Sequence, residues 1–372
     1  MKEVLRPTRV EIDLKALDNN IKVIRSIIGN RKIMSVVKAN AYGHGLLPIA
    51  KHLVKNDIDY LAVAFIEEAI QLRKEGIKIP ILVLGAINNE QIEMFLKNDI
   101  SLTGSSEEKL ESISSEAERL NITAKVHLKV DTGMGRIGVQ WDRIDPFLKK
   151  AFSLPSLKIE GVFSHFANSP TDKEFTNTQI ERFNIVLEKV SKYIDRNNIL
   201  IHLSNSGAID NKIEDAFFDM IRTGLMMYGY STNTEVQKKL QPVMNFKTKI
   251  SYFKVLNKGL TVGYNRTYTT KEMTRIATLP VGYADGYPRS LSNKGNVFIN
   301  NKKYPVIGNV CMDQTMVNLG NDGEAYNGDD VLLWGKDKSS YINLWDVSKL
   351  SNRSIYEILC SISQRVPRVY ID

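Results

Sequence analysis

Residues 33–45 read IMSVVKANAYGHG, and they join a short apolar run to a lysine. The run at 33–37 is rich in β-branched residues and has the length of a buried strand. The positions after Lys38 then bring together small residues, an asparagine, a tyrosine and a histidine. A lysine at a strand end is usually a solvated charge, so a functional role for Lys38 requires support from the rest of the chain.

The same unit, an apolar run followed by a helical pattern, recurs along the first two thirds of the chain. Stretches such as EEAIQLRKEG and FNIVLEKVSKYI place apolar residues three and four positions apart, as amphipathic helices do. Eight such units predict a closed parallel (β/α)8 barrel within the α/β class, with a doubly wound open sheet as the alternative. A helix at KALDNNIKVIRSIIG precedes the first barrel strand. The runs lie at 33–37, 60–65, 81–85, 100–103, 125–130, 159–165, 199–204 and 219–229.

The pattern changes after GYSTNTE at residues 229–235. Segments such as FKTKISYFKVL, RIATLPVGYA and DVLLWG are strand-like and are separated by turn residues. Helical periodicity is nearly absent until VSKLSNRSIYEILCSI. We therefore expect a barrel over residues 1–233 and a mostly β domain over residues 234–372.

Composition excludes several classes of protein. The net charge of +8 comes from lysines scattered among glutamates, without the basic runs and interleaved aromatics of a nucleic-acid-binding surface. No stretch has the apolar length of a membrane span. Cys311 and Cys360 form neither a disulfide framework nor a metal-binding spacing. We expect a cytoplasmic protein without metal, nucleic acid or membrane as partner.

Polar residues gather where the barrel strands end, which is the edge at which barrel enzymes build their active sites. Taken singly, each is at least as well explained by a structural role, which for Arg136, Arg222 and Lys129 would be a salt bridge at the barrel rim. Together they favour one polar site around Lys38. They are Lys38 and Tyr42 at the end of the first strand, Lys129, Asp131 and Arg136 at the end of the fifth, His165 at the end of the sixth, Ser206 at the end of the seventh, and Arg222 and Gly224 at the end of the eighth.

The residue types at these strand ends suggest a cofactor. Ser206 and the backbone N–H groups of residues 223–225 resemble a phosphate cradle, as late barrel loops often do. A lysine facing such a cradle suggests a Schiff base with pyridoxal 5'-phosphate. Arg222 would then serve the pyridine nitrogen, and Arg136 the phenolate oxygen of the ring.

A glycine motif offers a competing interpretation. TGMGRIG at residues 132–138 has the G-x-G-x-x-G spacing of dinucleotide-binding proteins. It follows the fifth strand rather than the first, and no acidic residue ends a strand about twenty positions later. The motif therefore does not indicate a dehydrogenase.

VVKANAYGHG resembles the pyridoxal phosphate attachment signature of alanine racemases. The likeness covers nearly the whole chain, from about residue 9 to residue 370, in the family's order. It continues through HLKVDTGMGRIG, FSHFA, SNSGA, RTGLMMYG, VGYNRTY, LPVGYADGYPR, GNVCMDQ and YEILCSISQRVPR.

The resemblance implies interconversion of L-alanine and D-alanine through a pyridoxal phosphate aldimine, supplying D-alanine for peptidoglycan. Lys38 would be one base, and Tyr264 of the partner subunit in a homodimer would be the other. Substrate would meet Arg136 and the backbone amide of Met312. Lys129, often carbamylated in this family, would position Arg136. Cofactor contacts would be Lys38, Tyr42, His165, Ser206, Arg222, Gly224, Leu225 and Tyr356, and the access corridor would hold Tyr283, Arg289 and Asp313.

Three positions depart from the family's pattern. Asn265 replaces a common glycine, Asn309 a common arginine, and Ser354 a common apolar residue. These changes concern the access corridor rather than the reaction.

Two bases on opposite faces of a planar carbanion can invert the configuration of the α-carbon without rotation of the intermediate. A free phenol has a pKa near 10, so Tyr264 needs a cationic network through His165 and Arg222. An arginine is a permanent donor, so Arg222 would leave the pyridine nitrogen unprotonated and weaken the electron sink.

Rival interpretations are a racemase of broader specificity that also accepts serine, a decarboxylase on the same architecture, and a non-catalytic pyridoxal phosphate carrier. Such carriers are lone barrels, so the additional domain with Tyr264 argues against the last.

Overall fold

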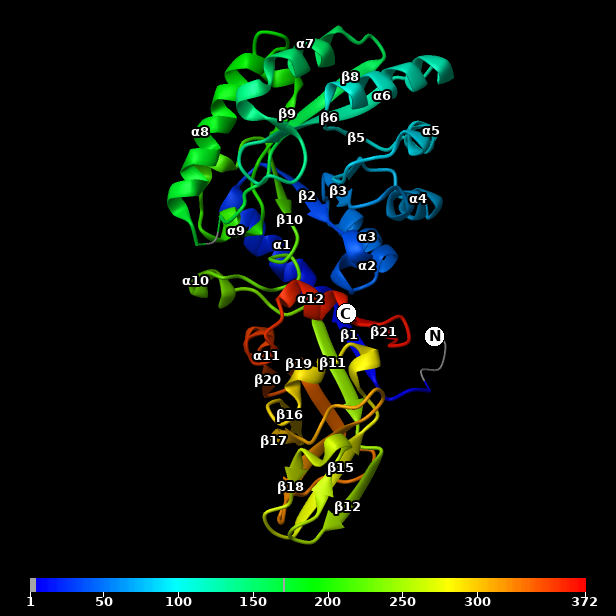
Figure 1. Ribbon diagram of the computed structural model, residues 1–372, viewed down its shortest axis with the longest axis vertical. Coiled ribbons are helices and arrows are strands. Elements are labelled where there is room, and N and C mark those ends of the chain that lie inside the picture. The colour runs from blue at the N-terminus through cyan, green and yellow to red at the C-terminus, as the bar shows by residue number, and fades with distance from the viewer. Residues whose placement is uncertain (1–4, 170) are drawn as a thin grey trace. The chain divides into compact units, whose positions relative to one another are not determined.

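The computed structural model describes residues 5–169 and 171–372, which form two compact units (Figure 1). One unit contains residues 18–41 and 45–241. The other contains the described residues up to Leu17, together with 42–44 and 242–372. The chain thus enters the second unit three times, once in the middle of the signature around Lys38.

The first unit is a parallel barrel, as the sequence predicted. Two parallel ladders run in the orders β10-β2-β3-β4 and β5-β6-β8-β9. A parallel bridge between Leu82 and Ser101 joins them on one side, and the 3.1 Å hydrogen bond from Arg222 N to Ser204 O joins them on the other. The strands are β2 (Lys32–Val36), β3 (Tyr60–Val63), β4 (Ile81–Val83), β5 (Leu102–Gly104), β6 (Ala124–Asp131), β8 (Leu157–Phe163), β9 (Leu200–His202) and β10 (Met220–Thr223).

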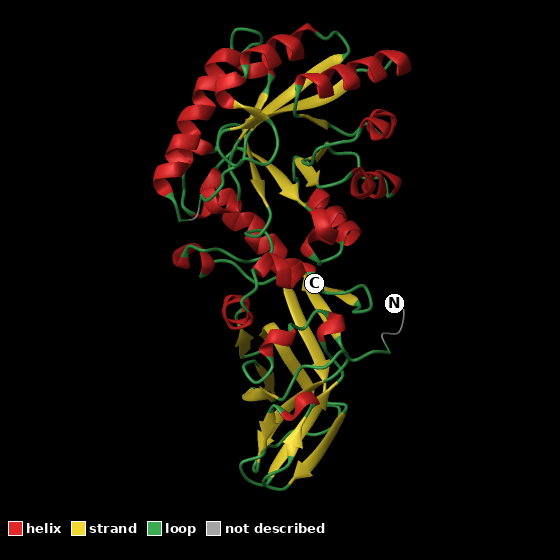
Figure 2. Ribbon diagram, in the orientation of Figure 1, coloured by secondary structure: helices red, strands yellow, loops and turns green. Residues whose placement is uncertain are grey.

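Helices surround these strands (Figure 2). In α6 (Glu107–Leu120), Leu110, Ile113 and Ala117 are buried at intervals of three and four residues. Burial of the leucine and of the isoleucine side chain each stabilises the fold by about 1.5–3 kcal/mol. Ser106 caps its first turn by accepting the N–H of Lys109. The others are α1 (Leu14–Ile28), α3 (Leu46–Lys55), α4 (Ile66–Lys74), α5 (Ile92–Lys97), α7 (Asp145–Ser153), α8 (Lys173–Val190), α9 (Ser206–Asp210) and α10 (Thr234–Gln237).

The barrel strands are buried on both faces, as in parallel sheets covered by helices. In β6, Val126, Leu128 and Val130 have no exposed surface. His127 in the same strand and His202 in β9 are equally buried. The barrel interior therefore contains polar groups, which in most proteins have hydrogen-bond partners inside the fold.

The second unit is built on a sheet of order β12-β15-β18-β17-β16-β19-β11-β1-β21, with β20 paired to β19. The N-terminal strand β1 (Arg9–Asp13) lies between antiparallel β11 and parallel β21, so it belongs to this unit although it precedes the barrel. The other strands are β11 (Met244–Lys249), β12 (Tyr252–Leu256), β15 (Thr274–Leu279), β16 (Asn296–Ile299), β17 (Lys302–Ile307), β18 (Thr315–Gly320), β19 (Asp330–Asp337), β20 (Ser340–Ile342) and β21 (Arg368–Ile371).

Smaller elements complete the second unit. A short hairpin of β13 (Thr261–Val262) and β14 (Tyr268–Thr269) carries the loop with Tyr264. Two helices, α11 (Leu344–Ser351) and α12 (Ile355–Cys360), precede β21. Among the helices of the described residues, none combines the length and apolar character needed to cross a bilayer.

Candidate active site

Strand β2 leads directly into a strained turn that begins at Lys38. The short helix α2 (Lys38–Tyr42) is left-handed, with φ of 54° at Ala39, 56° at Asn40 and 53° at Ala41. This conformation costs about 1–2 kcal/mol for each residue other than glycine. Glu68 Oε1 accepts the N–H of Ala39 at 2.6 Å, and Asn40 Oδ1 accepts that of Leu46 at 2.7 Å. A turn maintained against strain at a strand end is typical of functional sites.

A cluster of cations surrounds His165 in the barrel. Burial, followed by the charges of Arg222, Lys129, Arg136 and Lys38, lowers the pKa of His165 well below its usual value. His165 is therefore neutral at physiological pH. The barrel thus brings together five of the residues that the sequence indicated.

Arg222 lies in β10 with only 3% of its surface exposed. Its Nη1 donates to Nδ1 of His202 at 2.9 Å and to the carbonyl of the same residue at 2.8 Å. Its Nη2 faces the carbonyls of Ser164 and Leu203 at 2.7 and 3.0 Å, and Nδ1 of His165 at 3.2 Å.

All these acceptors of Arg222 are uncharged, and its Nε–H has no hydrogen bond within the described residues. Burial, and then repulsion from Arg136, lower the pKa of the Arg222 guanidinium to about 9. The guanidinium therefore retains a positive charge at neutral pH and has one donor that is free for a ligand.

Ser206 begins helix α9 beside the loop that follows β10. Its Oγ accepts the backbone N–H groups of Gly224 at 3.2 Å and Met226 at 3.3 Å, with Leu225 between them. Asn205 caps the helix by accepting the N–H of Ala208. Because the Ser206 oxygen already accepts twice, its own hydroxyl proton is directed to another group, as an anion site requires.

The glycine motif after β6 wraps around a carboxylate of the chain itself. Asp131 Oδ1 accepts the N–H groups of Gly133 and Met134, each at 2.9 Å, and Asp131 Oδ2 accepts that of Gly135 at 3.0 Å. The backbone donors that would hold a dinucleotide phosphate are therefore occupied. The loop instead presents Arg136 with an exposed side chain.

In the second unit, one pocket of about 630 Å³ contains Tyr264, the second proposed base, and the residues expected in the access corridor. Tyr264 is 72% exposed at this pocket. The lining is Tyr264, Tyr283, Arg289, Asn309, Val310, Cys311, Met312, Asp313 and Gln314. The pocket thus collects five residues that the sequence indicated for catalysis, substrate and access.

The loop with Tyr264 has a strained backbone and is held by a hydrogen bond from a residue outside the loop. φ is positive at Gly263 (75°), Asn265 (59°) and Arg266 (52°). Asparagine tolerates this conformation better than most residues, which accounts for Asn265 where glycine is common. Asn309 Nδ2 donates to the carbonyl of Tyr264 at 2.9 Å. Asn309, the second departure from the family pattern, therefore anchors this loop.

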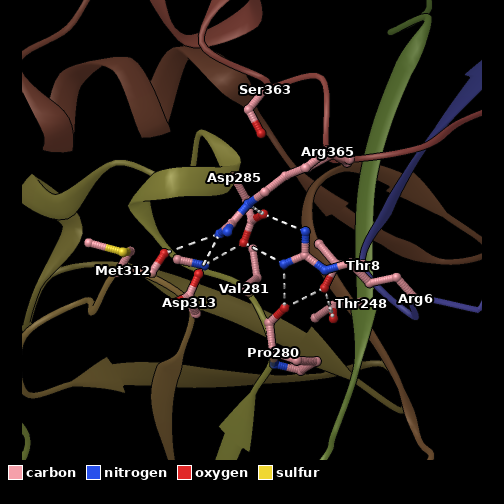
Figure 3. A network of polar contacts seen from close by, with 12 residues as sticks. Arg6, Thr8, Thr248, Pro280, Val281, Asp285, Met312, Asp313, Ser363 and Arg365 are labelled. Atoms are coloured by element: carbon pink, nitrogen blue, oxygen red, sulfur yellow. Dashed lines mark hydrogen bonds and ion pairs between the residues drawn. The ribbon is translucent and has the colours of Figure 1, made fainter.

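A buried carboxylate organises the neighbouring loops (Figure 3). Asp285 accepts from Arg6 at 2.6 and 2.8 Å and from Arg365 at 2.7 Å. Arg365 also donates to Asp313 at 2.7 Å. Burial opposes ionisation of Asp285, but its bonds from Arg6, the Gly282 N–H and Arg365 outweigh burial and lower its pKa. Asp285 thus links the segment around Tyr283 to the pocket wall.

The two tyrosines expected at the phosphate lie together in the second unit. The ring centroids of Tyr42 and Tyr356 are 5.9 Å apart. Burial, and then the proximity of Tyr356, raise the pKa of Tyr42, so it remains a neutral donor. Ser354 caps α12 by accepting the N–H of Glu357 at 3.2 Å, which explains this third departure from the family pattern.

Two residues of the barrel cluster were not anticipated from the sequence, namely His127 and His202. His127 lies inside β6, in KVHLKV, and His202 is the last residue of β9, in ILIHLS. A histidine between apolar residues of a predicted buried run was the available signal, because such a ring is expected to have a hydrogen-bond partner. No group of three His, Cys, Asp or Glu suited to a metal ion occurs in the part of the chain that the structure describes.

A barrel with a lysine after its first strand, an arginine held by neutral acceptors and a serine bound to the loop after its last strand is the arrangement of a class of cofactor-dependent barrel enzyme with an added β domain. Residues 12–232 match the alanine racemase N-terminal domain, and residues 243–370 match the C-terminal domain. The chain belongs to the alanine racemase family, and it is an isomerase.

Similar proteins support this assignment over the full length. The chain is 44% identical to the alanine racemase of Halothermothrix orenii over 374 residues, covering 99% of this chain and 98% of the other. The solved alanine racemase of Clostridium difficile 630 is 36% identical with a TM-score of 0.91, covering 99% and 97%. That of Bartonella henselae, described with covalently bound pyridoxal phosphate, is 29% identical with a TM-score of 0.89, covering 98% and 99%.

Proposed function

We propose that the protein interconverts L-alanine and D-alanine with pyridoxal 5'-phosphate bound covalently to Lys38. The observation that carries this proposal is the guanidinium of Arg222, which is charged, buried and surrounded by neutral acceptors, and whose Nε–H has no partner among the described residues. A ring nitrogen with a lone pair fits this donor. The hydroxyl proton of Ser206 and the backbone N–H of Leu225, which lies between the two N–H groups that Ser206 accepts, suit a phosphate.

When bound, pyridoxal phosphate withdraws electrons from the α-carbon of an amino acid and so acidifies its proton. Arg222 would keep the ring nitrogen unprotonated, which limits that withdrawal and disfavours side reactions such as transamination. Lys38, once its amine is released by the incoming amino acid, would take or return the α-proton on one face.

Tyr264 of the partner subunit would serve the opposite face. Because Nδ1 of His165 accepts from Arg222, the His165 proton lies on Nε2 and is available to the phenolate oxygen of Tyr264. Arg136 and the backbone amide of Met312 would bind the substrate carboxylate. The domain of residues 234–372 would thus complete the active site of the partner subunit in a homodimer. The D-alanine that the enzyme forms would be used for peptidoglycan.

The test combines a spectrum with an assay of the purified protein. We expect visible absorbance that borohydride traps on Lys38, and formation of D-alanine from L-alanine and of L-alanine from D-alanine. Serine, assayed beside alanine, measures the breadth of specificity. Lys38→Ala should lose both the trapped cofactor and the activity. Full retention of borohydride-trapped cofactor in Lys38→Ala would assign the anchor to another lysine.

A further inference from the structure

Two histidines form a row behind Arg222 inside the barrel. His202 ends β9 and His127 lies in β6, and both side chains are fully buried. Nη1 of Arg222 lies 2.9 Å from Nδ1 of His202, and Nε2 of His202 lies 2.9 Å from Nδ1 of His127. The three side chains therefore form one continuous hydrogen-bonded row.

The proton positions in this row follow from Arg222, because a guanidinium donates and never accepts. Nδ1 of His202 must accept, which leaves the proton of a neutral ring on Nε2. That proton is donated to Nδ1 of His127, so the proton of His127 also lies on Nε2. Burial, and then the charge of Arg222, lower the pKa of His127 to about 3 and that of His202 well below its usual value, which keeps both rings neutral.

The packing around the rings fixes their orientation. The ring of Phe163 stacks on that of His202, with centroids 4.8 Å apart and planes 3° apart. Gly161 makes room for the other ring, since a Cβ at this position would lie 2.2 Å from Nδ1 of His127. Nε2 of His127 has no hydrogen-bond partner among the described residues. A buried donor without an acceptor is costly, and an apolar residue at position 127 would avoid that cost.

We propose that His202 and His127 are positioning residues that fix the guanidinium of Arg222 through this single arrangement of protons. An imidazole accepts one Nη1 proton without neutralising the positive charge, whereas a carboxylate would form an ion pair. His127 ensures that Nδ1 of His202 remains the acceptor. The Nε–H of Arg222 thereby stays available to the ring nitrogen. This inference rests on the proposed role of Arg222.

Pairs of variants that share their branching separate positioning from packing. His202→Asn and His202→Leu both replace the ring by a side chain branched at Cγ, but only the asparagine offers an acceptor near the position of Nδ1. We expect kcat to fall roughly 10- to 100-fold in His202→Leu, as for a small displacement of a catalytic group, and to be largely restored in His202→Asn. His127→Leu and His127→Asn should show the same order with a smaller loss. Equal losses within each pair, at matched thermal stability, would overturn the proposal.

Nitrogen NMR of the holoenzyme measures chemical shifts that would not change if His202 and His127 served only for packing. With ¹⁵N-histidine, we expect His127 and His202 both to be neutral with the proton on Nε2, and a proton on Nδ1 of His202 would contradict the row. With ¹⁵N in the cofactor ring, His202→Leu should shift the ring signal and His202→Asn should shift it less. An unmoved ring signal in His202→Leu would overturn the positioning role. The histidine signals do not depend on catalysis, so failure of the racemase proposal is seen separately in Lys38→Ala.

Discussion

The Nζ of Lys129 lies 5.2 Å from the centre of the Phe163 ring and donates to the carbonyl of Val130 at 2.8 Å. Only 3% of Lys129 is exposed. Burial, and then repulsion from Arg222, lower its pKa to about 7, while Asp131 partly opposes this shift. An amine that is partly neutral at physiological pH is a nucleophile, unlike an ordinary lysine.

Lys129 should therefore add carbon dioxide to form a carbamate, whose negative charge would be stabilised by Arg136 and Arg222. We expect a carbonyl signal in ¹³C NMR after incubation with ¹³C-bicarbonate, absent in Lys129→Gln. The signal should weaken as pH falls below about 7, because protonation removes the reactive amine. A spectrum without this signal at pH 8, with Lys129 intact, would contradict carbamylation.

Without carbon dioxide, the same pKa predicts how stability depends on pH. The folded protein binds fewer protons than the unfolded chain between about pH 7 and the ordinary lysine value near 10.4. The contribution of Lys129 to the free energy of unfolding should thus rise with pH across this window and stay constant below it. Denaturation in CO₂-free buffer should show a steeper rise for the wild type than for Lys129→Met, and parallel curves would be inconsistent with a depressed pKa.

Loss of the anchor at Asn309 should slow catalysis more than it weakens the fold. Asn309→Leu keeps the branching at Cγ but cannot donate to the carbonyl of Tyr264, so the strained loop can relax. We expect kcat to fall about 10-fold, corresponding to about 1.4 kcal/mol, with a small change in melting temperature. Asn309→Arg restores a donor and should recover most of the rate. If both variants behave alike, the hydrogen bond to Tyr264 does not position the loop.

Asp285→Asn should destabilise the protein, because Arg6 and Arg365 would lose their charged acceptor. The loss should be about 1–3 kcal/mol, since both arginines are partly exposed. The pKa of Asp285 is lowered in the folded state, so its contribution is present above the ordinary aspartate pKa and disappears as pH falls. Urea denaturation should show wild type and variant converging in acid. A constant difference at all pH values would refute an ionised Asp285 as the source.

Sequence reasoning found the barrel because its signal is local. Each strand is a short apolar run, and each helix carries its own period of burial. The same logic located Lys38, His165, Ser206 and Arg222, because the carboxyl ends of parallel strands share one edge.

The remaining features depend on long-range contacts. β1 pairs with β11 and β21, more than 200 residues away, and no local pattern indicates those partners. The row from Arg222 to His127 joins three strands, and its hydrogen bonds can be recognised only from the positions of the three side chains in the structure. The left-handed turn that begins at Lys38 contains alanines, which do not favour that conformation, so it could not be predicted from the amino-acid composition.

The central claim is that each active site takes Lys38 from one subunit and Tyr264 from the other. Lys38→Ala and Tyr264→Phe homodimers should each be nearly inactive. When the two are unfolded and refolded together in equal amounts, about half of the dimers are hybrids, in which one site carries both lesions and the other none.

Racemisation of alanine by the refolded mixture is the most direct measurement. Activity should rise to roughly a quarter of the wild-type value, since about one site in four is intact. Differently tagged subunits confirm that hybrids have formed. If Tyr264 serves the site of its own chain, every site carries one lesion, and a mixture that contains hybrids but remains inactive would contradict the shared site.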